Sequence, residues 1–236
     1  RMHFISALMV TLGAHFSAIW IVVANSWMQT PAGYHIVQAA LGPRAEITDF
    51  WAMVFNPSSV VRLTHTVLGA WQAGAFLVLS VSAYYLLKKR HEDFAKASMK
   101  IGLVVAAVSS LASLASGHFS AEVVAEHQPA KLAAMEAHFP ASAPAGLYLF
   151  GWVDEEAQTV KGGVEIPDLL SLMVHRDPKA PVTGLNAFPK EDWPPVNPTF
   201  QTYHIMIVIG MGLIGLSLLG LLLWWLGKLF AARWLL

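Results

Sequence analysis

Four long apolar stretches dominate the sequence and restrict its fold more than any other feature. They cover approximately residues 4–28, 59–87, 97–116 and 201–226, and each is long enough for a helix to cross the hydrocarbon core of a bilayer. Of the 236 residues, 56% are hydrophobic and only 13% are charged, which is not the composition of a soluble domain. Backbone groups in lipid must satisfy one another, so we predict an all-α, polytopic transmembrane helical bundle with four spans, forming a single membrane domain over residues 1–236.

Basic residues predict how the spans are oriented. The formal net charge is zero, so charge offers no case for nucleic-acid binding. One side of the predicted bundle nevertheless carries eight Lys and Arg residues against only two acidic ones, and this side should be cytoplasmic. The eight are Arg1, Lys88, Lys89, Arg90, Lys96, Lys100, Lys228 and Arg233. The connections 29–58 and 117–200 are then expected on the outer side of the membrane.

The chain contains no cysteine, which excludes disulfides, thiolate-bound iron-sulfur clusters and Cys-ligated zinc. Any metal must therefore be held by His, Met or carboxylate side chains. The chain begins with Arg1 directly before an apolar stretch and ends at Leu236 without a polar tail, and it shows no signal peptide. We expect it to be an internal fragment of a longer polypeptide.

Two potential metal ligands lie near the outer ends of their spans. An ionisable residue such as His65 inside a membrane-spanning stretch is a functional-site hypothesis by default, and Met206 lies at a matching depth of roughly 8 Å in the last span. Imidazole and thioether are an axial pair for a six-coordinate, low-spin haem. Gly69 and Gly210 each follow their candidate ligand by four residues, so they share its helical face and leave room for a flat macrocycle.

Other readings of these residues remain open. An intramembrane His can simply hydrogen-bond within a bundle, and Met is an ordinary packing residue. A copper site formed by His65, His204 and Met206 is also chemically possible. It is the weaker hypothesis, because residues i and i+2 of a helix point about 200° apart.

Polar residues in the first span suggest a proton route. Ser17 and Asn25 are about two turns apart and share a helical face. A proton path through the bundle would need such an arrangement, but hydrogen bonds between helices would produce the same spacing.

The outer connection 117–200 is too long for a simple link and holds ten of the thirteen prolines; loops of this length are functional or partly disordered. Within it, residues 128–136 predict a short helix, with Pro129 in its first turn. Lys131 is suited to donating a hydrogen bond to an oxygen of a small redox substrate, and Glu136 to accepting its proton. A solvated Lys and Glu on an exposed helix is the alternative. Residues 188–195 predict an extended segment over the membrane surface.

Several motifs together resemble subunit I of cytochrome bd, the bacterial quinol oxidase. They are GAHFSAIWIVVANSWMQTP at residues 13–31, Asn56-Pro57 leading to His65-Thr66-Val67, QPAKLAAME at residues 128–136, and IMI at residues 205–207. They are distributed over most of the chain, and the first and third are highly specific.

The resemblance implies roles for the residues already singled out. His65 and Met206 match the axial ligands of the low-spin haem b, and Lys131 and Glu136 match residues of the outer quinol-binding loop. Ser17 and Asn25 match polar residues of a proton route from the cytoplasm. The complete subunit would also hold a high-spin haem b and either haem d or a further haem b. It would use ubiquinol or menaquinol and oxygen, and would lie in the bacterial cytoplasmic membrane beside subunit II, with small single-span accessory subunits as further partners.

Two departures from the family pattern qualify these expectations. The family commonly has Arg two residues before the ligand Met, where it pairs with a haem propionate. Here that position holds His204, whose charge depends on pH. The long loop is of the shorter kind, and ligands of the other haems lie on helices outside this chain. The fragment itself should therefore hold at most one complete haem site.

The expected function is electrogenic quinol oxidation: electrons pass through the low-spin haem to oxygen, and proton motive force arises without a proton pump. A haem-binding electron conduit or scaffold of the same fold, without oxygen chemistry, is the alternative. A transporter is disfavoured, because no pair of Gly/Pro-broken spans is related by an internal repeat.

Overall fold

The computed structural model describes residues 1–40 and 42–236. Four helices in this part of the chain are long and apolar enough to cross a membrane, as predicted. They are α1 (Met2–Gln29), α3 (Ser59–Leu87), α4 (Glu92–His127) and α7 (Val196–Trp225). The protein is 63% helical, which confirms the predicted fold class.

Helix α4 is longer than the apolar stretch that predicted it. It runs for 36 residues, so the long connection begins at Gln128 rather than at residue 117. Its last turns are polar, and they are held by an ion pair between Glu122 and Arg176 at 2.9 Å. A hydropathy pattern detects only the apolar part of a helix, so it does not predict a polar extension of this kind.

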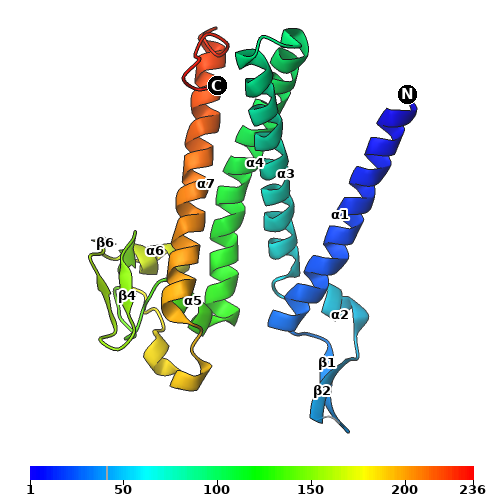
Figure 1. Ribbon diagram of the computed structural model, residues 1–236. Helices are drawn as coiled ribbons and strands as arrows, with labels where there is room; N and C mark the ends of the chain where they lie inside the picture. Colours follow the sequence, from blue (N-terminus) through cyan, green and yellow to red (C-terminus); the bar gives the residue numbers. More distant parts are fainter. Residues whose placement is uncertain (41) are drawn as a thin grey trace.

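Helices α3 and α4 form a tight hairpin around which the other long helices are arranged (Figure 1). The turn between them covers only residues 88–91. Helix α4 packs against both α3 and α7, whereas α1 contacts α3 and diverges from it toward the N-terminus (Figure 1). The two long connections lie at the opposite end of the bundle from the α3–α4 turn and the C-terminus.

Small residues let the helices of the hairpin approach closely. The buried face of α4 contains Ala106, Ala107, Ser109 and Ser110, the residue types that membrane helices use at close interfaces. On α7, a Cβ added at Gly220 would lie 2.7 Å from a methyl carbon of Leu103, so a larger residue there would require the Leu103 side chain to move.

The connection between α1 and α3 folds into a hairpin and a short helix. Strand β1 (Tyr34–Ala39) pairs with β2 (Gly42–Ile47) in antiparallel register, and α2 (Phe50–Val54) is capped by the Asp49 carboxylate, which accepts from two backbone amides. Neither strand was predicted from the sequence.

The long connection is a folded unit with its own core. Its elements are α5 (Pro129–Met135), α6 (Leu169–His175), the 3-10 helices η1 (Leu185–Ala187) and η2 (Lys190–Asp192), and four short strands. The strands are β3 (Leu147–Tyr148), which pairs with β6 (Glu165–Ile166), and β4 (Trp152–Asp154), which pairs with β5 (Thr159–Lys161). Helix α5 confirms the predicted short helix, whereas η2 interrupts the segment predicted to be extended.

The core of this unit is continuous with α7. Phe139, Leu185, Val196 and Phe200 are almost fully buried together, and the last two belong to the first turns of α7. The loop is therefore packed rigidly onto the end of the bundle that carries the candidate site.

Candidate functional site

His65 is oriented by a residue of the neighbouring helix. Its Nδ1 lies 2.8 Å from the hydroxyl oxygen of Ser116 on α4, and this hydroxyl donates its own proton to the carbonyl of Ser113 at 3.1 Å. Ser116 must then accept from His65, so Nδ1 carries the proton and the lone pair is on Nε2. In the described part of the chain, Nε2 has no hydrogen-bond partner. A metal-ligating histidine has this arrangement, with one nitrogen anchored and the other available to the metal.

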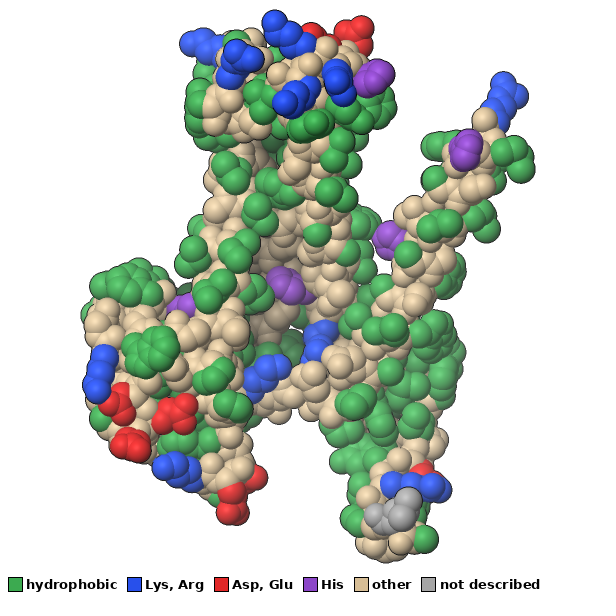
Figure 2. Space-filling view, viewed as in Figure 1, with side chains coloured by type: hydrophobic (Ala, Val, Ile, Leu, Met, Phe, Trp, Pro, Cys, Tyr) green, Lys and Arg blue, Asp and Glu red, His purple; other side chains and the backbone are tan. Residues whose placement is uncertain are grey.

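The surroundings of His65 and Met206 leave space for a large planar group. A Cβ added at Gly69 or at Gly210 would meet no atom within 4 Å, and the Met206 side chain is 52% exposed. On the α4 side, the imidazole lies over Gly117, where an added Cβ would be 3.5 Å from its Cε1, an ordinary van der Waals contact. Figure 2 shows a hollow between the helices, with a histidine on its wall and basic side chains at its lower edge. Each of the two predicted ligands therefore has open space beside it on its own helix.

His204, for which a propionate contact was predicted, is held by backbone carbonyl groups. It is buried, and its two ring nitrogens each lie 2.8 Å from a backbone carbonyl oxygen, Nδ1 from Phe200 and Nε2 from Tyr148. Its ring also stacks on Phe200 with centroids 4.0 Å apart. Neither nitrogen is left for a haem propionate. These contacts join α7 to strand β3, so His204 fastens the folded loop to the bundle.

The copper alternative loses support from the same contacts. Both ring nitrogens of His204 lie against backbone carbonyl oxygens, so neither is left for a metal ion in this arrangement.

Lys131 projects from α5 into a polar cluster at the end of α1. Its Nζ donates to the side-chain oxygens of Gln29 at 3.3 Å and Gln128 at 3.4 Å, and Gln128 also donates to the Gln29 carbonyl at 3.1 Å. Burial, with a further contribution from the positive charge of Arg62, lowers the pKa of Lys131. These neutral, long contacts leave an ammonium group that is available to a ligand oxygen.

Asn25 belongs to the same cluster, whereas Ser17 does not. The Asn25 side-chain oxygen accepts from Arg62 and from Gln29, which joins α1 to α3. Ser17 is exposed and makes no side-chain hydrogen bond within the described residues. The structure therefore places the two predicted proton-route residues in different surroundings, with no hydrogen-bonded connection between them.

Glu136 is the most deeply buried acid of the loop. It is 4% exposed, and its Oε2 has no hydrogen-bond partner among the described residues. Burial raises its pKa to about 7, although the hydroxyl of Tyr203 on α7 acts in the opposite direction. A carboxyl group with a pKa near neutrality is well suited to exchanging protons with a substrate.

Lys131 and Glu136 thus lie at the two ends of α5 and face different partners. Lys131 faces α1 and α3, and Glu136 faces α7. The sequence analysis missed Gln29, Arg62, Ser116 and Tyr203 as neighbours of the predicted residues. Gln29 lies within the first of the specific motifs, which was a usable signal; the other three are recognisable only from the packing of the helices.

The chain thus combines four helices able to cross a membrane, an anchored histidine in one of them, and a buried acid, Glu136, in the folded long connection. The family profile described as cytochrome bd terminal oxidase subunit I matches residues 1–236. The chain belongs to this family.

Relatives and a solved structure agree with this assignment. The chain is 35% identical over 211 residues to the cytochrome bd-II ubiquinol oxidase subunit 1 of Escherichia coli, covering 89% of this chain and 41% of the relative. It is 34% identical over 244 aligned positions to the cytochrome bd ubiquinol oxidase subunit 1 of Bacillus subtilis, covering 99% and 51%. The bd oxidase structure from Geobacillus thermodenitrificans superposes with a TM-score of 0.84 at 31% identity, covering 99% of this chain and 52% of that chain. The chain therefore spans about half the length of the relatives it matches.

Proposed function

We propose that this chain is the part of a cytochrome bd quinol oxidase subunit I that oxidises quinol and holds the low-spin haem b. His65 and Met206 would be the axial ligands of this haem. The observation that carries the proposal is the hydrogen bond from His65 Nδ1 to Ser116, because it leaves the Nε2 lone pair available beside the open face of Gly69. When bound, the haem supplies a one-electron carrier with both axial positions filled.

The residues of the outer unit would bind quinol and take its protons. Lys131 donates a hydrogen bond from Nζ to one quinol oxygen, and the nearby Arg62 adds positive charge that favours the developing anion. Glu136 in its carboxylate form accepts a quinol proton, which its pKa of about 7 permits near neutral pH. The buried position of Glu136 excludes bulk water from this transfer.

The side of the membrane on which quinol protons are released follows from which end of the helical bundle carries the quinol site. The folded unit that carries Lys131 and Glu136 lies at the end opposite the basic residues of the α3–α4 turn (Figure 2), which the positive-inside rule assigns to the cytoplasm of a bacterium. Quinol protons would leave on the outer side, while the protons used to reduce oxygen would come from the cytoplasm. This division generates proton motive force without a pump.

The complete enzyme would contain further haems and subunits in addition to this chain. The oxygen-reducing haems, namely a high-spin haem b and either haem d or a further haem b, would be held mainly by segments beyond this chain. Subunit II and small accessory subunits would complete the complex. The two relatives named above are described as ubiquinol oxidases, and a further relative from Bacillus subtilis as a putative menaquinol oxidase. We therefore propose ubiquinol or menaquinol as the substrate class.

A reduced-minus-oxidised visible spectrum of membranes containing the full-length subunit and its partner tests the ligand assignment. We expect His65→Ala and Met206→Leu each to remove the low-spin b-type signal or convert it to high spin, with loss of quinol oxidation. Met211→Leu, which changes another exposed methionine of α7, is the control and should keep the signal. A low-spin spectrum unchanged in both ligand variants would refute the assignment. Oxygen consumption then separates the oxidase from a non-oxidase electron conduit of the same fold.

A further inference from the structure

Two adjoining cavities lie at the end of the bundle opposite the candidate haem site. The first has a volume of about 290 Å³ and is bounded by the α3–α4 turn, the start of α4 and the C-terminal segment. The second, of about 180 Å³, lies deeper, between α3, α4 and α7. Leu236 lines both cavities, so they meet at this residue.

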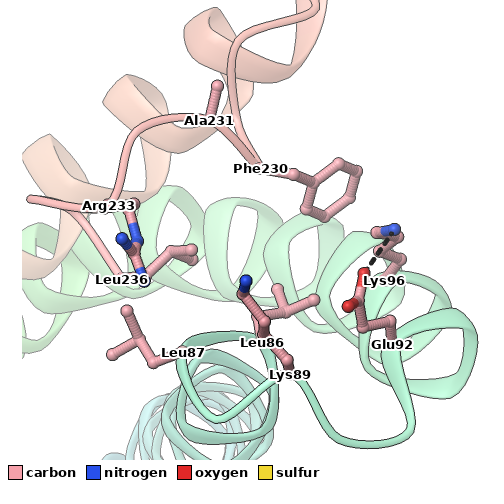
Figure 3. Close-up of a pocket in the computed structure, with 9 residues that line it drawn as sticks. All are labelled: Leu86, Leu87, Lys89, Glu92, Lys96, Phe230, Ala231, Arg233 and Leu236. Atoms are coloured by element: carbon pink, nitrogen blue, oxygen red, sulfur yellow. Dashed lines mark hydrogen bonds and ion pairs between the residues drawn. The ribbon is translucent and has the colours of Figure 1, made fainter.

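The first cavity carries an excess of positive charge. Its charged residues are Lys89, Lys96, Arg233 and Glu92. Glu92 is the one acidic side chain of this lining, and it pairs with Lys96 at 3.1 Å. In the described part of the chain, no carboxylate forms an ion pair with Lys89 or Arg233. Figure 3 shows these two side chains entering the same space from the α3–α4 turn and from the C-terminal segment. The cavity is therefore suited to an anion that two cations hold from opposite sides.

The second cavity is suited to hydrocarbon. Its wall consists mostly of apolar side chains, among them Leu79, Met99, Leu103 and Leu216. The hydroxyls of Ser80 and Ser217, which also line it, are both satisfied by carbonyls of their own helices. No polar group in this wall therefore needs a partner from a ligand, and an apolar chain can fill the space without leaving a hydrogen bond unmade.

An anionic head joined to an apolar chain is the chemistry of an acidic phospholipid. We propose that the two cavities form a binding site for one anionic phospholipid, whose phosphate lies between Lys89 and Arg233 and one of whose acyl chains enters the space between α3, α4 and α7. The site lies at the end of the spans where headgroups meet water, and Phe230 and Leu86 at its edge match the boundary between headgroup and chain. A free phosphate ion would leave the apolar cavity unfilled.

The full oxidase complex, reconstituted into nanodiscs containing equal amounts of phosphatidylglycerol and phosphatidylcholine, provides the test. Native mass spectrometry of the released complex measures which lipid is retained. Each basic residue near a membrane surface contributes measurably to anionic lipid binding, so we expect Lys89→Gln combined with Arg233→Gln to weaken phosphatidylglycerol retention about 30-fold. The matched control is Arg90→Gln combined with Lys228→Gln, which removes the same charge at the same end from residues outside both cavities.

A second variant tests the apolar half separately. Ser80→Phe places a ring in the second cavity, and we expect it to lower phosphatidylglycerol retention while leaving the charges intact. Selective retention by wild type and by the control pair, with loss in the two test variants, supports the site. Equal phosphatidylglycerol retention in wild type and in Lys89→Gln/Arg233→Gln overturns it. Retention of phosphatidylcholine as strong as that of phosphatidylglycerol, or displacement of the lipid by inorganic phosphate alone, also overturns it. So does a polypeptide segment found in the cavities by electron cryomicroscopy. The haem spectrum should be unchanged throughout, so this test stands apart from that of the proposed function.

Discussion

His65 and Ser116 are 51 residues apart in the chain, yet their side chains form a 2.8 Å hydrogen bond between α3 and α4. The bond sets the tautomer and the ring orientation of the histidine before any ligand binds. Loss of such an orienting partner typically weakens metal binding about 10–100-fold.

Ser116→Ala should therefore reduce haem retention by roughly that factor without removing either axial ligand. Haem content per polypeptide and the reduced-minus-oxidised spectrum measure the effect. Ser109→Ala is a suitable control, because the Ser109 hydroxyl donates only to carbonyls of its own helix. Full haem retention in Ser116→Ala would show that the contact is mere packing.

Gly69→Leu should remove the low-spin haem while leaving the polypeptide folded. No atom lies within 4 Å of a Cβ at this position, and leucine favours a helix by up to about 1 kcal/mol over glycine, so the added side chain harms only a bound macrocycle. Gly74→Leu changes another open glycine of α3, about 140° around the helix, and should keep the haem. Circular dichroism and the visible spectrum together decide between haem loss and misfolding.

Lys131→Met should impair quinol oxidation and leave the haem spectrum intact. A hydrogen bond from a charged donor contributes about 1.5–3 kcal/mol, so we expect kcat/KM for quinol to fall about 10–100-fold. Lys190→Met, at an exposed lysine of η2, should have wild-type kinetics. Steady-state oxidation of a soluble quinol analogue gives the comparison, and equal kinetics in both variants would remove Lys131 from the quinol site.

Quinol oxidation should rise with pH through about 7, because Glu136 accepts a proton only as the carboxylate and its pKa is raised to about 7. Glu136→Gln should abolish both this rise and most of the activity. The pH–rate profile of kcat/KM is the measurement. If the Glu136→Gln profile kept the same inflection, the titrating group would be a residue other than Glu136.

The same carboxyl group should make stability depend on pH. The folded protein binds this proton more tightly than the unfolded chain does, since the pKa rises from 4.5 to about 7 on folding. The stabilisation is complete below pH 4.5 and is lost as the pH rises through 7, by about 3 kcal/mol in all. Thermal unfolding of Glu136→Gln should accordingly show a smaller fall between pH 5 and 8 than the wild type shows.

His204→Phe should loosen the folded loop without affecting haem ligation. Phenylalanine keeps the stacking on Phe200 but cannot donate to the Tyr148 carbonyl, and leaving a buried acceptor unpaired costs about 1–3 kcal/mol. Faster hydrogen exchange in β3 and β6 is the expected readout. His175→Phe, at an exposed residue of α6, should leave exchange in these strands unchanged. A shifted haem potential with unaltered exchange would instead favour the predicted propionate contact.

The sequence predicted the spans well because hydropathy over some 20 residues is a strong signal. It predicted helix α5 because Pro129 marks a first turn. It did not predict the hydrogen bonds of His204, because they depend on where a loop carbonyl lies after the long connection has folded. The four short strands of the long connection were missed for a related reason: strands of two or three residues carry too little periodicity to be recognised.

The site residues divide in the same way. The choice of His65, Met206 and their glycines rests on residue type and on spacing along single helices, and their role as a haem site stays a prediction. The partners Ser116 and Tyr203 come from other helices, and only the packing of α3 on α4 and of α5 on α7 brings them to the predicted residues.

The short turn at residues 88–91 has a consequence for the order in which the site is assembled. Helical hairpins joined by so few residues form early, because their contacts are local in the chain. The orienting bond from His65 to Ser116 lies within that hairpin, whereas Met206 arrives on α7 only after the whole outer unit has been synthesised. We therefore expect the His65 imidazole to be oriented while the nascent chain is still incomplete. Haem insertion should follow only after Met206, the second ligand, has been synthesised.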